Sequence, residues 1–120
     1  MSWPGETGAS RLANFVVQWY SETMRFEVTF VPSADQDLDV YPAREQRIIL
    51  DAILEFLEAD ANVESKRRKQ LRPNSVAPWE LRIGDYRVFY EIRDAESVRV
   101  LAIGHKVHNE LYIRGQRIEL

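Results

Sequence analysis

The residues of this sequence that could bind or transform a substrate are mostly cations, and they gather in its second half. Residues 66–72 read KRRKQLR, which places five cations in seven positions. Guanidinium groups grip phosphate through paired hydrogen bonds, and lysines add a less directional attraction. We therefore predict a surface that binds a polyanion. Its candidate cations are Lys66, Arg67, Arg68, Lys69, Arg72, Arg82, Arg87 and Arg93.

Residues that could transfer protons follow these cations along the chain. His105 and His108 form the motif HKVH, and an imidazole titrates near neutral pH. Tyr112 could donate a hydrogen bond or a proton, although a place at the edge of the core explains it equally well. Two histidines without a third ligand make a poor metal site, so we expect neither metal nor cofactor.

The composition restricts the class of protein. The chain has 120 residues, a net charge of −3 and no cysteine, which excludes disulfides and zinc–thiolate sites. Residues 1–65 hold four Arg and twelve acidic residues, whereas residues 66–120 hold twelve Lys or Arg and seven acidic residues. A molecule polarised in this way can present a basic face despite its acidic total. No segment is apolar enough to span a membrane, and we expect a soluble cytoplasmic protein.

The elements that must position these residues can be read from hydrophobic periodicity. Residues 25–31 alternate as a half-buried strand, and residues 32–42 read as a loop or a poor short helix. Residues 43–58 carry apolar side chains at helical spacing. Strands follow at 79–83, 86–93 and 97–104, and the tail could end in a small hairpin around Gly115. These elements predict an α+β domain with a mostly antiparallel four-stranded sheet and a helical layer on one face.

The strand that begins at Tyr86 has two different faces. Tyr86, Val88, Tyr90 and Ile92 should face the helix, which leaves Arg87, Phe89, Glu91 and Arg93 on the other side. The simpler interpretation of that side is a solvated surface with cross-strand ion pairs such as Glu80–Arg93. The alternative is a nucleic-acid-binding face on which Phe89 stacks a base, unless Phe89 only covers a neighbouring side chain.

The first 24 residues read as a separate extension. Leu12, Phe15, Val16 and Trp19 have the spacing of a short amphipathic helix. Met24 stands immediately before the first strand, so a start codon assigned too far upstream explains the presence of these residues equally well. We therefore predict an extension at 1–24 and a domain at 25–120.

Several of these segments together resemble a known family. LRPN, APWELRIGDYRVFYEI, VRVLAIGHK and LY resemble the RelE/ParE superfamily, the toxins of bacterial type II toxin–antitoxin systems. The resemblance covers about residues 25–112 and is most specific in the segment LRIGDYRVFY and in IGHK with its following tyrosine. It implies a fold similar to microbial ribonucleases.

The resemblance also implies a reaction. RelE-like toxins cut mRNA on the ribosome without metal, by attack of the 2′-hydroxyl on the adjacent phosphate. Arg87 matches the family's phosphate-gripping arginine, Lys106 stands where a second arginine is usual, and Tyr112 matches the closing tyrosine. Glu80 replaces a lysine of RelE, so Glu80 and His105 become the candidate bases. The expected catalytic residues are Arg87, Lys106, Tyr112, His105 and Glu80.

The same fold allows other functions. ParE-like members bind and poison DNA gyrase without nuclease chemistry, and an inactive relative could bind only its antitoxin. The combination of Arg87, Lys106, a histidine and Tyr112 favours the endoribonuclease, which would inhibit translation. In each case the resemblance implies an antitoxin partner that covers the basic face with an acidic and apolar segment.

Overall fold

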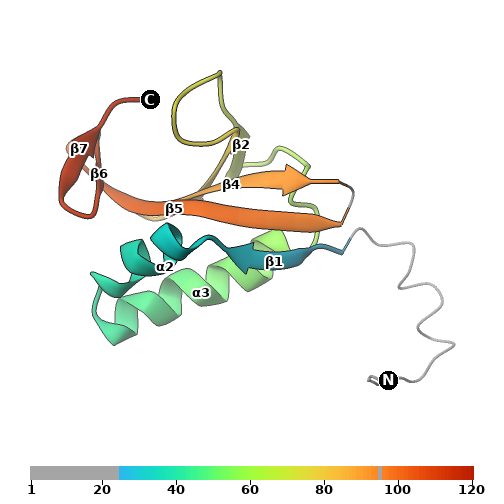
Figure 1. Cartoon of the computed structure of the whole chain (residues 1–120), viewed down its shortest axis with the longest axis horizontal. Coiled ribbons are helices and arrows are strands. Elements are labelled where there is room, and N and C mark those ends of the chain that lie inside the picture. The colour runs from blue at the N-terminus through green and yellow to red at the C-terminus, as the bar shows by residue number, and fades with distance from the viewer. Residues whose placement is uncertain (1–24, 95) are drawn as a thin grey trace, which may run out of the picture.

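The computed structural model describes residues 25–94 and 96–120, and the predicted amphipathic segment at 12–19 lies outside them. Within these described residues, seven strands form one sheet, and two helices cover one of its faces (Figure 1). The helices are α2 (Pro32–Asp39) and α3 (Ala43–Leu57). The strands are β1 (Glu27–Phe30), β2 (Arg68–Gln70), β3 (Trp79–Ile83), β4 (Tyr86–Arg93), β5 (Ser97–Val107), β6 (Glu110–Ile113) and β7 (Gln116–Ile118).

The sheet confirms the predicted α+β class and extends it. The strands follow the order β2-β3-β4-β5-β6-β7 with antiparallel pairs, and β1 pairs parallel with β5. The prediction of four strands was too low, because β2 forms inside the basic segment 66–72 and because β6 and β7 form the C-terminal hairpin. Arg114 and Gly115 have φ of 48° and 79° at its turn, which suits a two-residue hairpin.

The main core lies between the sheet and the helices. Ile49, Ala52, Ile53 and Leu57 of α3 are buried against Leu81, Val88 and Ile103 of the sheet. The predicted helix at 43–58 is thus confirmed. Residues 32–39, which could have been a loop, form α2 with a proline in its first turn.

A second, smaller core lies on the opposite face of the sheet. It contains Ala77, Phe89, Ala102 and Leu111, and the loop 71–78 and the β6–β7 hairpin supply side chains that cover it. Phe89 is 0% exposed, so the expectation that it could stack a base is wrong. Strand alternation placed it correctly away from the helices, but only the tertiary fold puts a loop and a hairpin over it.

A buried carboxylate ties the C-terminal hairpin to the helical layer. Asp37 of α2 is 2% exposed and accepts a hydrogen bond of 3.1 Å from the backbone N–H of Ile103. Its other oxygen pairs with Arg114 at 2.8 Å, and Arg114 also donates to Gln36. These contacts fix α2, β5 and the β6–β7 turn relative to one another. Neither helix is both long and apolar enough to cross a membrane in the described part of the chain.

Candidate functional site

Two cations of the basic segment brace the end of helix α3. Arg68 donates to the backbone oxygen of Phe56 in the last turn at 3.1 Å and to that of Val63 at 2.8 Å. The Arg67 guanidinium lies 4.9 Å from the centroid of the Phe56 ring. Both residues therefore have structural roles, which the count of cations in KRRKQLR could not reveal.

Four cations from four neighbouring strands share the face of the sheet that is turned away from the helices. Directly paired residues point to the same side, and the register pairs Lys69 with Glu80 and Arg82 with Arg87. Arg87 pairs in turn with Gly104 of β5, so Lys106, two residues further on, has the same orientation. We call Lys69, Arg82, Arg87 and Lys106 the basic face.

A buried carboxylate holds two of these guanidinium groups. The side chain of Glu80 is 4% exposed, and its Oε1 accepts a hydrogen bond of 3.0 Å from Arg82 Nε. Its Oε2 lies 3.6 Å from Arg87 Nε. The expected pair between Glu80 and Arg93 is not formed, because Phe89 stands opposite Glu80 and Arg93 contacts Glu91 instead. With its oxygens occupied in this way, Glu80 orients cations and is a poor candidate for the base.

Arg87 lies at the centre of the basic face. Its side chain is 14% exposed, and its Nη1 donates to the backbone oxygens of Gly84 at 2.8 Å and Tyr86 at 2.9 Å. Burial lowers the pKa of Arg87, and the negative charge of Glu80 opposes this shift. An arginine remains protonated under these conditions, so the guanidinium is a fixed charge beside the β3–β4 turn.

His105 and Tyr112 lie on the opposite side of the sheet. They are paired across β5 and β6, and their rings stack with centroids 5.9 Å apart. Tyr86 pairs with His105 and therefore lies on the same face of the sheet as these two residues, whereas Arg87 lies on the opposite face. The prediction that His105 and Tyr112 join Arg87 and Glu80 in one cluster is therefore wrong, because β5 presents successive residues to opposite faces.

Tyr41, at the corner between α2 and α3, completes the aromatic group around His105. Its hydroxyl lies 2.7 Å from His105 Nδ1, and its ring meets the Tyr86 ring edge-on at 5.6 Å. Burial raises the pKa of Tyr41 to about 12, and the nearby hydroxyl of Tyr86 and carboxylates add to the shift. The Tyr112 hydroxyl donates to Glu110, and this bond raises the pKa of Tyr112.

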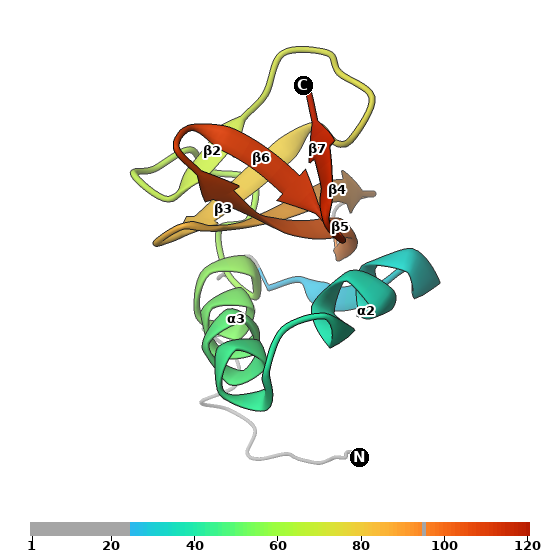
Figure 2. The ribbon, with the colours of Figure 1, turned by 90° about the vertical axis from the view of Figure 1, so that its left-hand side faces the viewer.

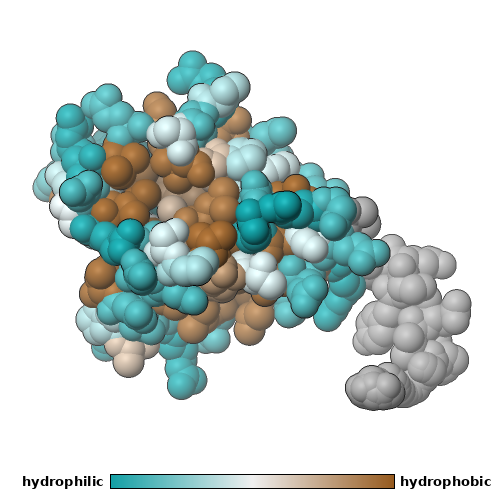
Figure 3. Space-filling model, in the orientation of Figure 1, coloured by the Kyte–Doolittle hydropathy of each residue, from teal (hydrophilic) through white to brown (hydrophobic). Residues whose placement is uncertain are grey.

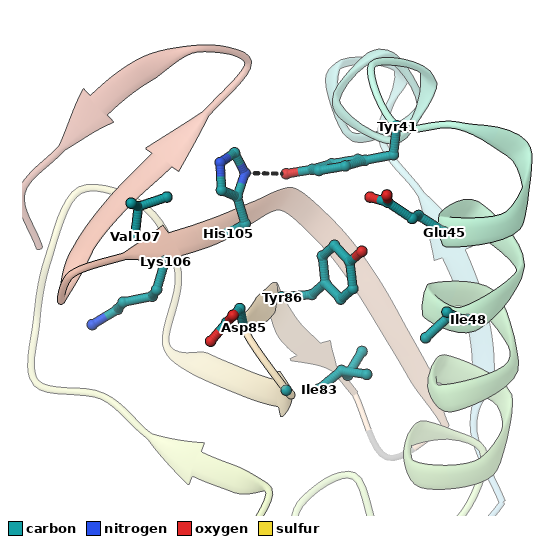
Figure 4. Close-up of a pocket in the computed structure, with 10 residues that line it drawn as sticks. Tyr41, Glu45, Ile48, Ile83, Asp85, Tyr86, His105, Lys106 and Val107 are labelled. Carbon is teal, nitrogen blue, oxygen red and sulfur yellow. Dashed lines mark hydrogen bonds between the residues drawn. The ribbon is translucent and has the colours of Figure 1, made fainter.

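The basic face and the aromatic group around His105 approach one another at a pocket of about 490 Å³ (Figure 4). His105 and Lys106 both line it, and Lys106 points away from the Tyr41–His105 hydrogen bond. The turn Gly84–Asp85 also lines this pocket, and Gly84 is the residue whose oxygen Arg87 contacts. The pocket thus adjoins the basic face at the start of β4.

Sequence reasoning missed several residues that organise this region. Tyr41 and Asp37 lie in a segment without a clear pattern, and only the packing of α2 brings them to β5. Gly104 did carry a signal, since a glycine inside an apolar strand often marks a close approach. A Cβ at Gly104 would collide with the backbone oxygen of Tyr112 and lie 2.9 Å from the Ile113 side chain.

The remaining predicted residues lie outside this arrangement. Arg93 lies at the far end of β4, and Lys66 and Arg72 are exposed in the connectors around β2. No three potential metal ligands of the His, Cys, Asp or Glu type come together within residues 25–94 and 96–120. The fixed cations of the basic face have the chemistry to hold a phosphate, and His105 lies in the adjoining pocket.

Comparisons with known proteins bear on the family and the fold of this chain. A family model described as ParE toxin of the type II toxin–antitoxin system parDE matches residues 28–109. One similar structure is a chain of the toxin–antitoxin complex RelBE2 from Mycobacterium tuberculosis, with 24% sequence identity and a TM-score of 0.56. The alignment covers 68% of the present chain and 99% of the RelBE2 chain. A chain of the archaeal RelE–RelB complex from Pyrococcus horikoshii OT3 has 20% sequence identity and a TM-score of 0.56. That alignment covers 71% of the present chain and 99% of the archaeal chain. No curated protein sequence matched. At these identities the two structures show a shared fold.

Proposed function

This chain belongs to the family of ParE toxins of type II toxin–antitoxin systems, and on that premise we propose that it is a ribosome-dependent endoribonuclease that cuts mRNA and inhibits translation. The observation that carries the proposal is the basic face, where four neighbouring strands each contribute one cation and a buried carboxylate holds two of them. We place its action in the cytoplasm, where ribosome-bound mRNA is found.

The basic face suits the charge that develops when RNA is cleaved. Attack of a 2′-hydroxyl on the neighbouring phosphate produces a crowded, doubly charged phosphorane, which preorganised cations stabilise. Glu80 holds Arg82 and Arg87 before substrate arrives, so little reorganisation is required. Lys106 supplies a third charge at the border of the pocket.

We assign proton transfer to His105. Tyr41 contacts Nδ1, and in the tautomer that donates from Nδ1 to Tyr41, the Nε2 atom is left to accept a proton. A phosphate held at Lys106 would place the adjacent 2′-hydroxyl in the pocket that His105 lines. The proton of the 2′-hydroxyl goes to Nε2 and the 2′-oxygen bonds to phosphorus. The bond from phosphorus to the 5′-oxygen breaks, and the 5′-oxygen keeps the electron pair and takes a proton from water.

The test separates binding from chemistry. We expect Arg87→Ala to abolish cleavage of ribosome-bound mRNA, measured by primer extension, while circular dichroism remains unchanged. Arg93→Ala, on the same strand but paired with Glu91 at the far end, is the matched control and should cleave normally. His105→Gln should lower the rate and flatten its pH dependence without weakening RNA binding.

Inhibition of DNA gyrase is the second candidate. The observation in its favour is that the sheet separates His105 and Tyr112 from Arg87, since a protein that only binds its target requires no proton transfer. Intact message together with gyrase-dependent DNA breaks in a plasmid supercoiling assay would select this function and reject the nuclease.

An antitoxin is the partner that we propose for the basic face. The two solved neighbours are toxin–antitoxin complexes by description. An acidic and apolar segment would neutralise Arg82 and Lys106 and would compete with RNA for the same charges. Mutation of Lys106→Glu should therefore weaken both interactions, measured by calorimetry with a peptide of the antitoxin and by RNA filter binding.

A further inference from the structure

The pocket between helix α3 and the strands carries two carboxylates that the proposed cleavage does not use. Glu45 lies in the first turn of α3, and Asp85 lies in the turn between β3 and β4. Figure 4 shows the Glu45 carboxylate pointing from α3 toward the space between Tyr41 and Tyr86. Neither carboxylate forms an ion pair with a Lys or Arg of the described ranges 25–94 and 96–120. Both therefore keep lone pairs that can accept hydrogen bonds from a ligand.

The remaining walls of the pocket are largely apolar. Ile48 of α3, Ile83 of β3 and the ring of Tyr86 line it. Figure 2 shows the helical layer on one side of the sheet, and the pocket lies where the first turns of α3 meet β3, β4 and β5. Hydrophobic residues reach the surface at several places of the face drawn in Figure 3, so apolar walls alone do not distinguish this pocket. What distinguishes it is the combination of apolar walls with hydrogen-bond acceptors in a volume of about 490 Å³, a size typical of ligand sites.

The charges around the pocket restrict what can enter it. Glu45 and Asp85 repel a phosphate from its interior, whereas Lys106 at its border attracts one. Lys106 also opposes the entry of a free cation. A ligand that satisfies both conditions is uncharged, flat and rich in N–H donors, and it is joined to a phosphate that stays at the border. A nucleobase of single-stranded RNA has these properties.

We propose that this pocket binds guanine on the nucleotide whose 2′-hydroxyl attacks, so that cleavage falls on the 3′ side of a guanosine. This inference rests on the proposed function and specifies its substrate. The Watson–Crick edge of guanine presents two adjacent donors, N1–H and the 2-amino group, which match the two oxygens of the Glu45 carboxylate. Adenine and cytosine present one donor beside an unprotonated ring nitrogen, and uracil presents one N–H between two carbonyl oxygens. A carboxylate repels those acceptors, so guanine is the base that fits.

The position of the pocket agrees with the role assigned to His105. His105 and Lys106 are adjacent on β5, and Glu45 faces them across the pocket from α3. Burial raises the pKa of Tyr86, and the nearby Glu45 carboxylate adds to the shift, so the Tyr86 hydroxyl stays protonated beside the bound base. A guanine on Glu45 with its 3′-phosphate at Lys106 places the 2′-hydroxyl of the same ribose on the side of His105.

Binding of mononucleotides to the full chain tests the pocket without any cleavage. Guanosine 3′-monophosphate and inosine 3′-monophosphate differ only in the 2-amino group, and their affinities can be compared by nuclear magnetic resonance titration. We expect the wild type to bind the guanosine nucleotide about tenfold more tightly, because its amino group donates to a charged acceptor. Glu45→Gln should bind both nucleotides equally, since its amide places an N–H opposite a donor. Glu55→Gln, further along α3 and outside the pocket, is the matched control and should keep the tenfold difference.

Single-turnover cleavage of ribosome-bound mRNA, mapped by primer extension, separates this inference from the proposed function. We expect cleavage after guanosine to exceed cleavage after each other base at least about tenfold, and Glu45→Gln to remove this preference. Cleavage without a base preference, or with one that Glu45→Gln leaves unchanged, would refute the guanine pocket while the nuclease stands. Guanosine binding that depends on Glu45 without any cleavage would support the pocket and reject the nuclease. If the two nucleotides bind equally to the wild type while Glu45→Gln weakens only the antitoxin, the pocket receives a basic side chain of that partner and the inference is overturned.

Discussion

The contact between Glu80 and Arg87 should be a measurable source of stability, because both side chains are nearly enclosed. Glu80 is 4% and Arg87 14% exposed, with 3.6 Å between Oε2 and Nε. At an effective dielectric constant of about 20, this separation corresponds to an attraction of about 4–5 kcal/mol before desolvation. Desolvation of the two ions offsets much of that value. We expect a net coupling of about 1–2 kcal/mol.

A double-mutant cycle isolates this coupling. Glu80→Gln leaves the Arg87 charge buried without its partner and should lower the free energy of unfolding by about 2 kcal/mol. Arg87→Met should cost less, because Arg82 still neutralises Glu80 at 3.0 Å. The double variant should be more stable than the sum of the two single losses predicts, by the coupling energy, as measured by urea unfolding followed by circular dichroism.

The pair Glu91–Arg93 on the same strand provides the control. Its atoms are 3.5 Å apart, almost the same separation, but its side chains are 26% and 52% exposed. Solvent screens this pair, so its coupling should stay below about 0.5 kcal/mol. Effects of Glu80→Gln and Arg87→Met that add within about 0.3 kcal/mol would show that Glu80 does not hold the guanidinium, and the preorganised basic face would lose its basis.

Other perturbations test the surrounding structure. Phe89→Ala should lower the free energy of unfolding by about 3–5 kcal/mol in urea, since it empties the second core, whereas a loss within about 0.5 kcal/mol would show that the side chain is not buried. Gly104→Ala should lower the melting temperature through its collision with Tyr112, and an unchanged value would contradict the close approach. Burial raises the pKa of Asp37 in the folded protein. The stability of the wild type relative to Asp37→Asn should therefore be highest below about pH 3.8, and it should fall as the pH rises through the folded-state pKa. The opposite slope would contradict that shift. Tyr41→Phe should reduce cleavage but not RNA binding, because it releases the His105 ring.

The strand from Tyr86 illustrates how much of the site could be predicted. Its alternation correctly separated Tyr86 and Val88, which face the helices, from Arg87 and Phe89. The exposure of that second face could not be predicted in this way. Loop 71–78 and the β6–β7 hairpin bury Phe89, and both come from segments distant in sequence.

The tail of the chain shows a different limit. Gly115 predicted a hairpin correctly, because a residue with positive φ leaves a local signal. The face on which Tyr112 would lie depends on its register with β5, and register is a long-range property. The proximity of His105 and Tyr112 was thus predictable in outline, whereas their separation from Arg87 was not.

The sequence by itself determined the α+β class, helix α3, the main strands and the concentration of cations, because periodicity and charge are properties of short segments. Only the tertiary structure decided that Arg67 and Arg68 brace α3, that Glu80 is enclosed between two arginines and that Tyr41 reaches His105. The physical reason is that burial and ion pairing depend on which distant segments pack together, and no local pattern records that choice.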